Sequence, residues 1–273
     1  MSAPVVPLSS TVTGVGPPVL MVAGTGFPGA TWPPGFIGPL AERYSVITFD
    51  HRGTGDSPKT EDDYSTRMFA ADALALLDRL GCGPAHVVGH SMGGRVAQWM
   101  AIDGPDRISS LVLAASGPGQ YRADTQQVQG IPLYQAVSLG ELGYEAFMRE
   151  QIRSAFFTPE FVLSDPAPVE WLVQAFWGKR PPLRDYLKHI VARQQHRTAD
   201  VLDQIRHDVL VLVGDRDTAS GGTGNHLEQS RFLAERIPHA RLRLIEGVSH
   251  GYFWQAPQET LTQIRDFLDA QPV

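Results

Sequence analysis

Cysteine is almost missing from this chain of 273 residues, since Cys82 is the only one. A disulfide within the chain is therefore excluded. Cys82 stands between two glycines near the expected end of a helix, with no activating residues around it in the sequence. We interpret it as a structural thiol rather than a nucleophile.

Clusters of basic residues and long apolar runs are missing as well. The formal net charge is −6 and no Lys/Arg cluster offers a footprint for phosphates, which argues against a nucleic-acid partner. No apolar run approaches the ~20 residues of a membrane span, and residues 1–18 lack the basic start and apolar middle of a signal peptide. We expect a soluble, cytoplasmic protein with no membrane partner, and predict no oligomeric state.

Metal and nucleotide motifs are weak or missing. No HExxH occurs, and no pair of histidines has a convincing metal-ligand spacing, so we expect no metal. Gly24, Gly26 and Gly29, followed by Asp50, match the dinucleotide-binding fingerprint. However, the prolines within 28–34 resist the continuous helix that this fingerprint requires. We therefore expect no nicotinamide or flavin, and no other cofactor.

Short apolar runs alternate with helical patterns along most of the chain. The runs are continuously apolar, as in strands buried on both faces, and cover residues 19–23, 45–50, 85–89, 111–115, 209–214 and 242–245. Helical patterns cover 65–80, 92–102, 227–236 and 259–268. This alternation predicts an α/β fold with a mostly parallel central sheet flanked by helices.

One stretch breaks this alternation. Residues 119–199 contain no buried-strand signal and read as several short helices rich in aromatic residues. We expect a helical cap insertion at 119–199 in a core domain made of 1–118 and 200–273. Five aromatic residues are candidates for an apolar substrate pocket: Phe27, Trp171, Phe176, Trp177 and Tyr252. The alternative for each is that it attaches the insertion to the sheet.

The motif Gly-His-Ser-Met-Gly at residues 89–93 lies between an expected strand and an expected helix. A serine on such a sharp turn is strained and exposed, and small residues on both sides relieve the crowding. The alternative is a glycine-rich turn that merely joins strand to helix. We predict that Ser91 is a nucleophile.

A serine nucleophile needs a base and a group that orients the base. Asp217 follows the strand at 209–214, and His250 lies between the last strand and the last helix, in the order Ser, acid, His. We predict Asp217 as the acid. Asp215 is the alternative, although we expect it to make local turn hydrogen bonds. The other histidines, His226 included, are interpreted as surface or capping residues.

Such chemistry also needs two N–H donors for an oxyanion. We predict the backbone of Met92, which follows the nucleophile, and the backbone of Thr25 in the loop after the first long strand. Gly26 or Phe27 would replace Thr25 if that loop follows a different path.

Taken together, these residues resemble the α/β-hydrolase superfamily over nearly the whole chain. Segment 49–57 (FDHRGTGDS) resembles the D-x-R-G-x-G-x-S turn, and segments 210–217 and 248–250 match the acid and histidine segments. Two departures are the Ala23-Gly24 pair where His-Gly is usual, and Thr218 with a glycine-rich loop where a proline usually follows the acid. The resemblance implies an α/β-hydrolase fold with a cap between the fourth and fifth strands noted above.

We therefore expect a serine hydrolase that cleaves a carboxylic ester or lactone of a small-to-medium apolar substrate through an acyl-enzyme on Ser91. The superfamily also contains cofactor-free perhydrolases (haloperoxidase-like enzymes) and C–C bond hydrolases, which stay open as alternatives. A small-ligand receptor without turnover is an alternative of another class.

Overall fold

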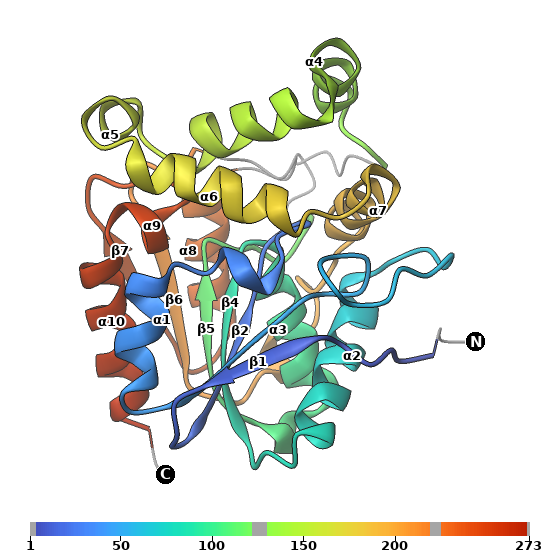
Figure 1. The fold of residues 1–273 in the computed structure, drawn as a ribbon. Coiled ribbons are helices and arrows are strands. Elements are labelled where there is room, and N and C mark those ends of the chain that lie inside the picture. Colours follow the sequence, from blue (N-terminus) through green and yellow to red (C-terminus); the bar gives the residue numbers. More distant parts are fainter. Residues whose placement is uncertain (1–3, 122–129, 219–224, 272–273) are drawn as a thin grey trace.

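The computed structural model describes residues 4–121, 130–218 and 225–271 (Figure 1). In these residues a seven-stranded sheet has the order β1-β3-β2-β4-β5-β6-β7. The strands are β1 (Ser10–Thr13), β2 (Pro18–Val22), β3 (Ser45–Phe49), β4 (Ala85–His90), β5 (Ile108–Ala114), β6 (Val209–Gly214) and β7 (Ala240–Ile245). All pairs are parallel except β1 with β3. The predicted fold class and its six strands are confirmed.

The edge strand β1 was not predicted. Its residues, Ser-Thr-Val-Thr, are mostly exposed and form no apolar run, so the hydrophobic pattern does not mark them. β1 pairs with β3 in register Ser10 to Phe49, which places it at the edge of the sheet.

Helices cover both faces of the sheet. On one face pack α1 (Pro34–Ala41), α9 (Tyr252–Gln255) and α10 (Pro257–Asp269); on the other pack α2 (Thr66–Arg79), α3 (Met92–Asp103) and α8 (His226–Arg236). Short 3-10 turns lie at Gly29–Thr31, Pro105–Arg107 and Leu202–Gln204. The apolar side chains of each face form one buried cluster with the helices above it, which is how such layered folds exclude water from a sheet.

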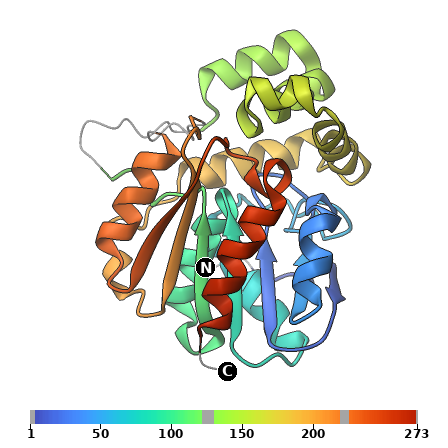
Figure 2. The same cartoon turned by 90° about the vertical axis from the view of Figure 1, so that its left-hand side faces the viewer.

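Between β5 and β6 the described chain is helical. It forms α4 (Leu133–Gln151), a π-helical turn (Ile152–Phe156), α5 (Pro159–Ser164), α6 (Ala167–Gly178) and α7 (Leu183–Gln194). Figures 1 and 2 show these helices stacked over one end of the sheet. The predicted cap at 119–199 includes residues 122–129, which lie outside the described residues, and the division into core and cap stays a prediction.

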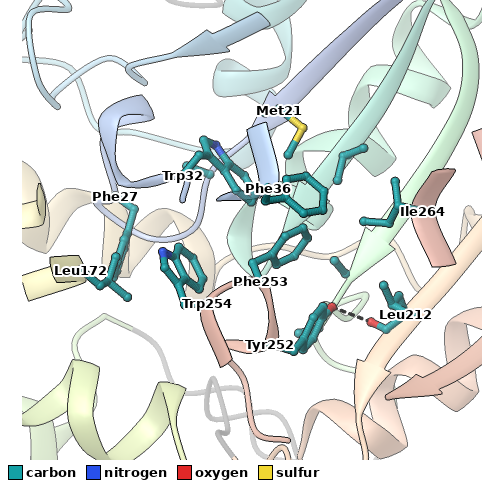
Figure 3. Close-up of a cluster of buried hydrophobic side chains, with 14 of the residues drawn as sticks. Met21, Phe27, Trp32, Phe36, Leu172, Leu212, Tyr252, Phe253, Trp254 and Ile264 are labelled. Atoms are coloured by element: carbon teal, nitrogen blue, oxygen red, sulfur yellow. Dashed lines mark hydrogen bonds between the residues drawn. The ribbon is translucent and has the colours of Figure 1, made fainter. Parts of the chain in front are cut away.

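Aromatic residues of α1, α9 and the loop after β2 form the core below this layer. Figure 3 shows Trp32, Phe36 and Phe253 packed together, with ring centroids 5.0 Å apart in the pairs Trp32–Phe253 and Phe36–Phe253. Tyr252 is fully buried there and donates a hydrogen bond of 3.0 Å to the carbonyl of Leu212. Among the described residues, no helix is long and apolar enough to cross a membrane.

Candidate active site

Ser91 lies on a strained turn between β4 and α3. Its φ of 57° and ψ of −118° fall in a region that non-glycine residues rarely adopt. The surrounding structure holds it there: its N–H donates to the carbonyl of Ala114 (2.8 Å), and its carbonyl accepts from Ser116 Oγ (2.8 Å) and from Gly94 N–H (3.1 Å). The strain is therefore maintained by three hydrogen bonds to the backbone of Ser91.

The glycines around Ser91 are required by close backbone contacts. A Cβ atom on Gly89 would lie 2.4 Å from the carbonyl oxygen of Gly93, and one on Gly93 would lie 1.9 Å from that of Val22. A Cβ on Gly94 would lie 2.5 Å from Cβ of Ser116. The expected crowding at this turn is thus present.

Asp217 and His250 form a buried pair. The distance between His250 Nδ1 and Asp217 Oδ2 is 2.8 Å, and both side chains are at most 5% exposed. Burial alone would raise the pKa of Asp217, but the adjacent histidines His250 and His226 hold it well below its ordinary value. Asp217 is therefore a carboxylate that can orient the His250 ring through Nδ1, which leaves Nε2 of His250 available to another group.

Asp215 has a different environment. Asp215 follows β6 directly and is exposed, and its Oδ1 accepts a 2.7 Å hydrogen bond from the backbone N–H of Gly247. This is the local turn bond expected for it. The geometry therefore pairs His250 with Asp217 and leaves Asp215 in the turn.

A second histidine shares the carboxylate, and the sequence analysis missed it. His226 is not a surface or capping residue: it is buried, its Nδ1 lies 3.2 Å from Asp217 Oδ1, and its ring stacks on that of His250 with centroids 4.5 Å apart. Burial lowers the pKa of His226 although Asp217 opposes this, so the ring is neutral at pH 7. Asn225 provides the helix cap instead, accepting from Glu228 N–H.

These three side chains also have the spacing of a metal site. One ligand atom of each of Asp217, His226 and His250 lies within 4.8 Å of the others, and this is the group of this kind found among the described residues. In the structure both Nδ1 atoms face carboxylate oxygens, which is the arrangement of a hydrogen-bonded network.

His90 contacts His250 through both its ring and a hydrogen bond. It is fully buried, its Nε2–H donates a 2.9 Å hydrogen bond to the carbonyl of His250, and its ring centroid lies 4.7 Å from that of His250. Burial, with the nearby charge of His250, lowers the pKa of His90 well below its ordinary value. His90 is thus a neutral donor that fixes the backbone at His250.

Ser91 and His250 line one cavity of about 380 Å³. Within the part of the chain that the structure describes, the hydrogen bonds of Ser91 use its backbone, so its hydroxyl is free to face this cavity. Bonds between a nucleophile and its base are often open without a substrate and tighten when it binds. Phe156, at the end of the π-helical turn, closes the cavity over His250, with centroids 5.1 Å apart.

The loop after β2 brings backbone amides to the same place. A Cβ on Gly24 would lie 3.3 Å from Cβ of Ser91, so the loop runs directly against Ser91. The Gly26 N–H donates to His189 Nδ1 (3.3 Å), and the Phe27 N–H donates to the Gly24 carbonyl (3.1 Å). Of the three candidate donors Thr25, Gly26 and Phe27, this leaves the N–H of Thr25 without an acceptor among the described residues, and its role as an oxyanion donor stays a prediction.

The predicted pocket residues are placed mostly elsewhere. Phe27 lines the cavity, but four do not: Trp171, Phe176, Trp177 and Tyr252. Phe176 is buried against Phe27 with centroids 5.2 Å apart, and Trp177 packs on Tyr144 and under Arg180. These four residues attach the helical layer to the sheet or fill the core, which is the alternative raised for them. The aromatic lining instead includes Phe156 and Tyr186.

The loop that resembles a dinucleotide fingerprint has another structure. Gly29 opens a 3-10 turn of three residues rather than a long helix. Both carboxylate oxygens of Asp50 are used, since they accept 2.8 Å hydrogen bonds from the N–H groups of Gly29 and Asp56. Asp50 is buried and ties two loops together.

Comparison with known proteins identifies the family. A sequence model described as alpha/beta hydrolase fold matches residues 17–257. A protein of Caulobacter sp. (strain K31), provisionally named carbamate hydrolase RutD, is 30% identical over 266 residues, covering 93% of this chain and 91% of its own. The solved structure of Est816, described as an N-acyl homoserine lactone degrading enzyme, is 26% identical with a TM-score of 0.78, covering 96% of this chain and 97% of its own. A bromoperoxidase from Bacillus anthracis is 24% identical with a TM-score of 0.84 over 97% of this chain and 96% of its own, a likeness of fold.

Proposed function

The chain belongs to the α/β-hydrolase family, and on that premise we propose that it hydrolyses ester-like bonds of small molecules through a nucleophilic Ser91. One observation carries the proposal: a strained serine at a helix N-terminus shares a cavity with a histidine that is hydrogen-bonded to a buried carboxylate. Nucleophile, base and orienting acid are the groups that acyl transfer by serine requires.

The proposed reaction begins when His250 Nε2 takes the proton of the Ser91 hydroxyl as its oxygen attacks the carbonyl carbon. Asp217 keeps the proton of the imidazole on Nδ1 and stabilises the imidazolium that forms. The N–H groups of Thr25 and Met92 stabilise the oxyanion, at roughly 3–4 kcal/mol for each donor in comparable sites. His250 then protonates the leaving group, and water activated by the same ring releases the acyl group and restores Ser91.

The size and lining of the cavity support a proposal for the substrate class. Its volume of about 380 Å³ suits a small to medium molecule, and its lining mixes apolar side chains such as Phe27, Met148 and Ile152 with polar ones. We propose a carboxylic ester or lactone as the substrate, with α4 to α7 acting as a cap over it. Hydrolysis of a carbamate, the activity in the name of the Caulobacter relative, would use the same steps at a carbonyl carbon.

Labelling with a fluorophosphonate probe tests the role of Ser91. We expect the wild-type protein to be labelled and Ser91→Ala to remain unlabelled, with hydrolysis of p-nitrophenyl esters (acetate to octanoate) reduced by at least about 10⁴-fold. Ser154→Ala is the matched control, because Ser154 lines the same cavity but its hydroxyl donates to the carbonyl of Glu150. Equal labelling of wild type and Ser91→Ala would refute the proposal.

A further inference from the structure

Two arginines line the cavity that contains Ser91. Arg95 and Arg193 both belong to its lining, while no aspartate or glutamate among the described residues does. Arg95 is buried and Arg193 is half-buried. Buried arginines are normally paired with carboxylates or phosphates, because an isolated buried charge costs several kcal/mol. The two arginines therefore mark a place where an anion would be stabilised.

Arg193, at the end of α7, has an unused hydrogen-bonding edge. Its Nε and Nη2 are buried and have no hydrogen-bond partner. The same edge binds carboxylates elsewhere in this chain: Nε and Nη2 of Arg52 contact the two carboxylate oxygens of Asp72 at 2.6 and 2.7 Å. Arg67 uses the same two nitrogens on Asp103. The open edge of Arg193 is thus the one that fits a carboxylate bidentately.

Arg95 contacts Arg193 through a hydrogen bond to its backbone carbonyl. It lies one turn of α3 beyond Ser91 and is 1% exposed. Its Nη1 donates to the carbonyl of Arg193 (2.6 Å) and its Nη2 to Gln229 Oε1 (3.4 Å), and neither bond neutralises its charge. Burial is the main cause that lowers the pKa of Arg95 to about 9, and the charge of Arg193 contributes to it. Burial also lowers the pKa of Arg193. An anion between or beside them would offset both effects.

We propose that Arg193, supported by Arg95, forms a carboxylate subsite in this cavity, so that the substrate is an ester or lactone that carries a second, acidic group. The inference rests on the proposed function, since it places the scissile carbonyl at Ser91. Nε and Nη2 of Arg193 have no accessible surface in this structure, so binding requires that the guanidinium turn this edge toward the cavity that Arg193 lines. Arg193 then selects the substrate, while Ser91 and His250 perform the reaction.

A pair of matched esters tests the subsite. Mono-p-nitrophenyl glutarate and p-nitrophenyl pentanoate have acyl chains of equal length, and only the first ends in a carboxylate. We expect the wild-type kcat/KM to be at least tenfold higher for the glutarate, and the ratio of the two values to fall to about one in Arg193→Met. The ratio within each variant cancels a general loss of activity. A wild-type ratio of one or less, or a ratio unchanged in Arg193→Met, would overturn the proposal.

Two further variants complete the kinetic test. Arg197→Met removes the same charge from the surface, where Arg197 is 61% exposed and paired with Asp200, and should keep the wild-type ratio. Arg193→Lys keeps the charge but loses the planar fork, so the ratio should fall several-fold. If Arg193→Met does not fold, as judged by its melting temperature, an unchanged ratio in Arg193→Lys would equally overturn the proposal.

Binding without turnover separates this inference from the proposed function. In Ser91→Ala, titration calorimetry should show monomethyl glutarate binding at least tenfold more tightly than methyl pentanoate, which lacks the free carboxylate, and this difference should vanish when Arg193→Met is added. If monomethyl glutarate binds in this way but no ester is hydrolysed by the wild type, the subsite stands and the hydrolase proposal falls. If esters are hydrolysed but monomethyl glutarate binds no more tightly than methyl pentanoate, the subsite falls and the hydrolase proposal stands.

Discussion

A single carboxylate serves two imidazoles in this site. One oxygen of Asp217 faces His250 and the other faces His226, whose ring stacks on that of His250. Because burial keeps His226 neutral, it adds a hydrogen-bonding group but no charge beside the carboxylate. Asp217 is therefore held from both sides, and its orientation toward His250 depends on both histidines.

The acid can be identified by paired substitutions. Asp217→Asn should lower kcat by about 10³–10⁴-fold, because an amide no longer holds the required tautomer of His250. Asp215→Asn should stay within about threefold of wild type, since Asp215 only accepts a turn bond from Gly247 and local surface effects are small. Steady-state kinetics with one ester substrate measures both. A larger loss in Asp215→Asn than in Asp217→Asn would reverse the assignment.

At the scale of elements, α7 connects the helical layer to the loop after β2. His189 of α7 accepts the N–H of Gly26 at Nδ1 (3.3 Å) and donates through Nε2 to the carbonyl of Arg52 (2.9 Å). Burial lowers the pKa of His189 to about 4, so Nδ1 remains an acceptor at neutral pH. Tyr186 of the same helix lies over Gly26, where a Cβ would be 2.5 Å from its ring. One helix thus positions the proposed oxyanion loop.

Removal of the His189 contacts should therefore affect catalysis. His189→Leu, which lacks both bonds, should lower kcat about tenfold with little change in KM, because a bond that aligns oxyanion donors acts mainly in the transition state. His189→Gln offers an acceptor and a donor and should recover part of the loss. A change confined to KM in His189→Leu, or no recovery in His189→Gln, would argue that His189 is only structural.

The whole molecule buries several histidines in the neutral form. Burial, with a smaller effect of the charge on His189, lowers the pKa of His51 to about 3, and burial lowers that of His189 to about 4, compared with 6.5 for a free side chain. As pH falls through 6.5, His51 and His189 become protonated in the unfolded chain but stay neutral in the folded protein. The unfolded state then holds more protons, so the free energy of unfolding decreases with falling pH.

Acid should therefore destabilise the protein well above pH 4. Between about pH 6.5 and pH 4, these two histidines contribute a loss of up to about 2.7 kcal/mol per pH unit. Urea unfolding at about pH 7.5 and pH 5 would measure it. His189→Gln should reduce the pH dependence, whereas His239→Gln, a change at an exposed position, should leave it intact. Equal free energies of unfolding at both pH values would contradict the prediction.

The amino-acid sequence by itself determined the six parallel strands, the turn at Ser91 and the loops that carry Asp217 and His250. These features depend on local sequence. A buried strand has a short run of apolar residues, and the strained turn needs glycines at fixed spacing. The loops that follow parallel strands all lie at the same edge of the sheet. The exposed strand β1 left no apolar pattern and could not be predicted in this way.

Only the tertiary structure decided what surrounds these residues. His226 contacts Asp217 because it is the first residue of α8 and lies buried beside that carboxylate. Arg95 donates a hydrogen bond to the carbonyl of Arg193, which is 98 positions away in the sequence. Whether an aromatic side chain lines the cavity, as Phe27 does, or fills the core, as Tyr252 does, depends on which face of its element meets a neighbour. Such contacts join distant parts of the chain, and hydrophobic periodicity reports only that a residue is buried, not against what.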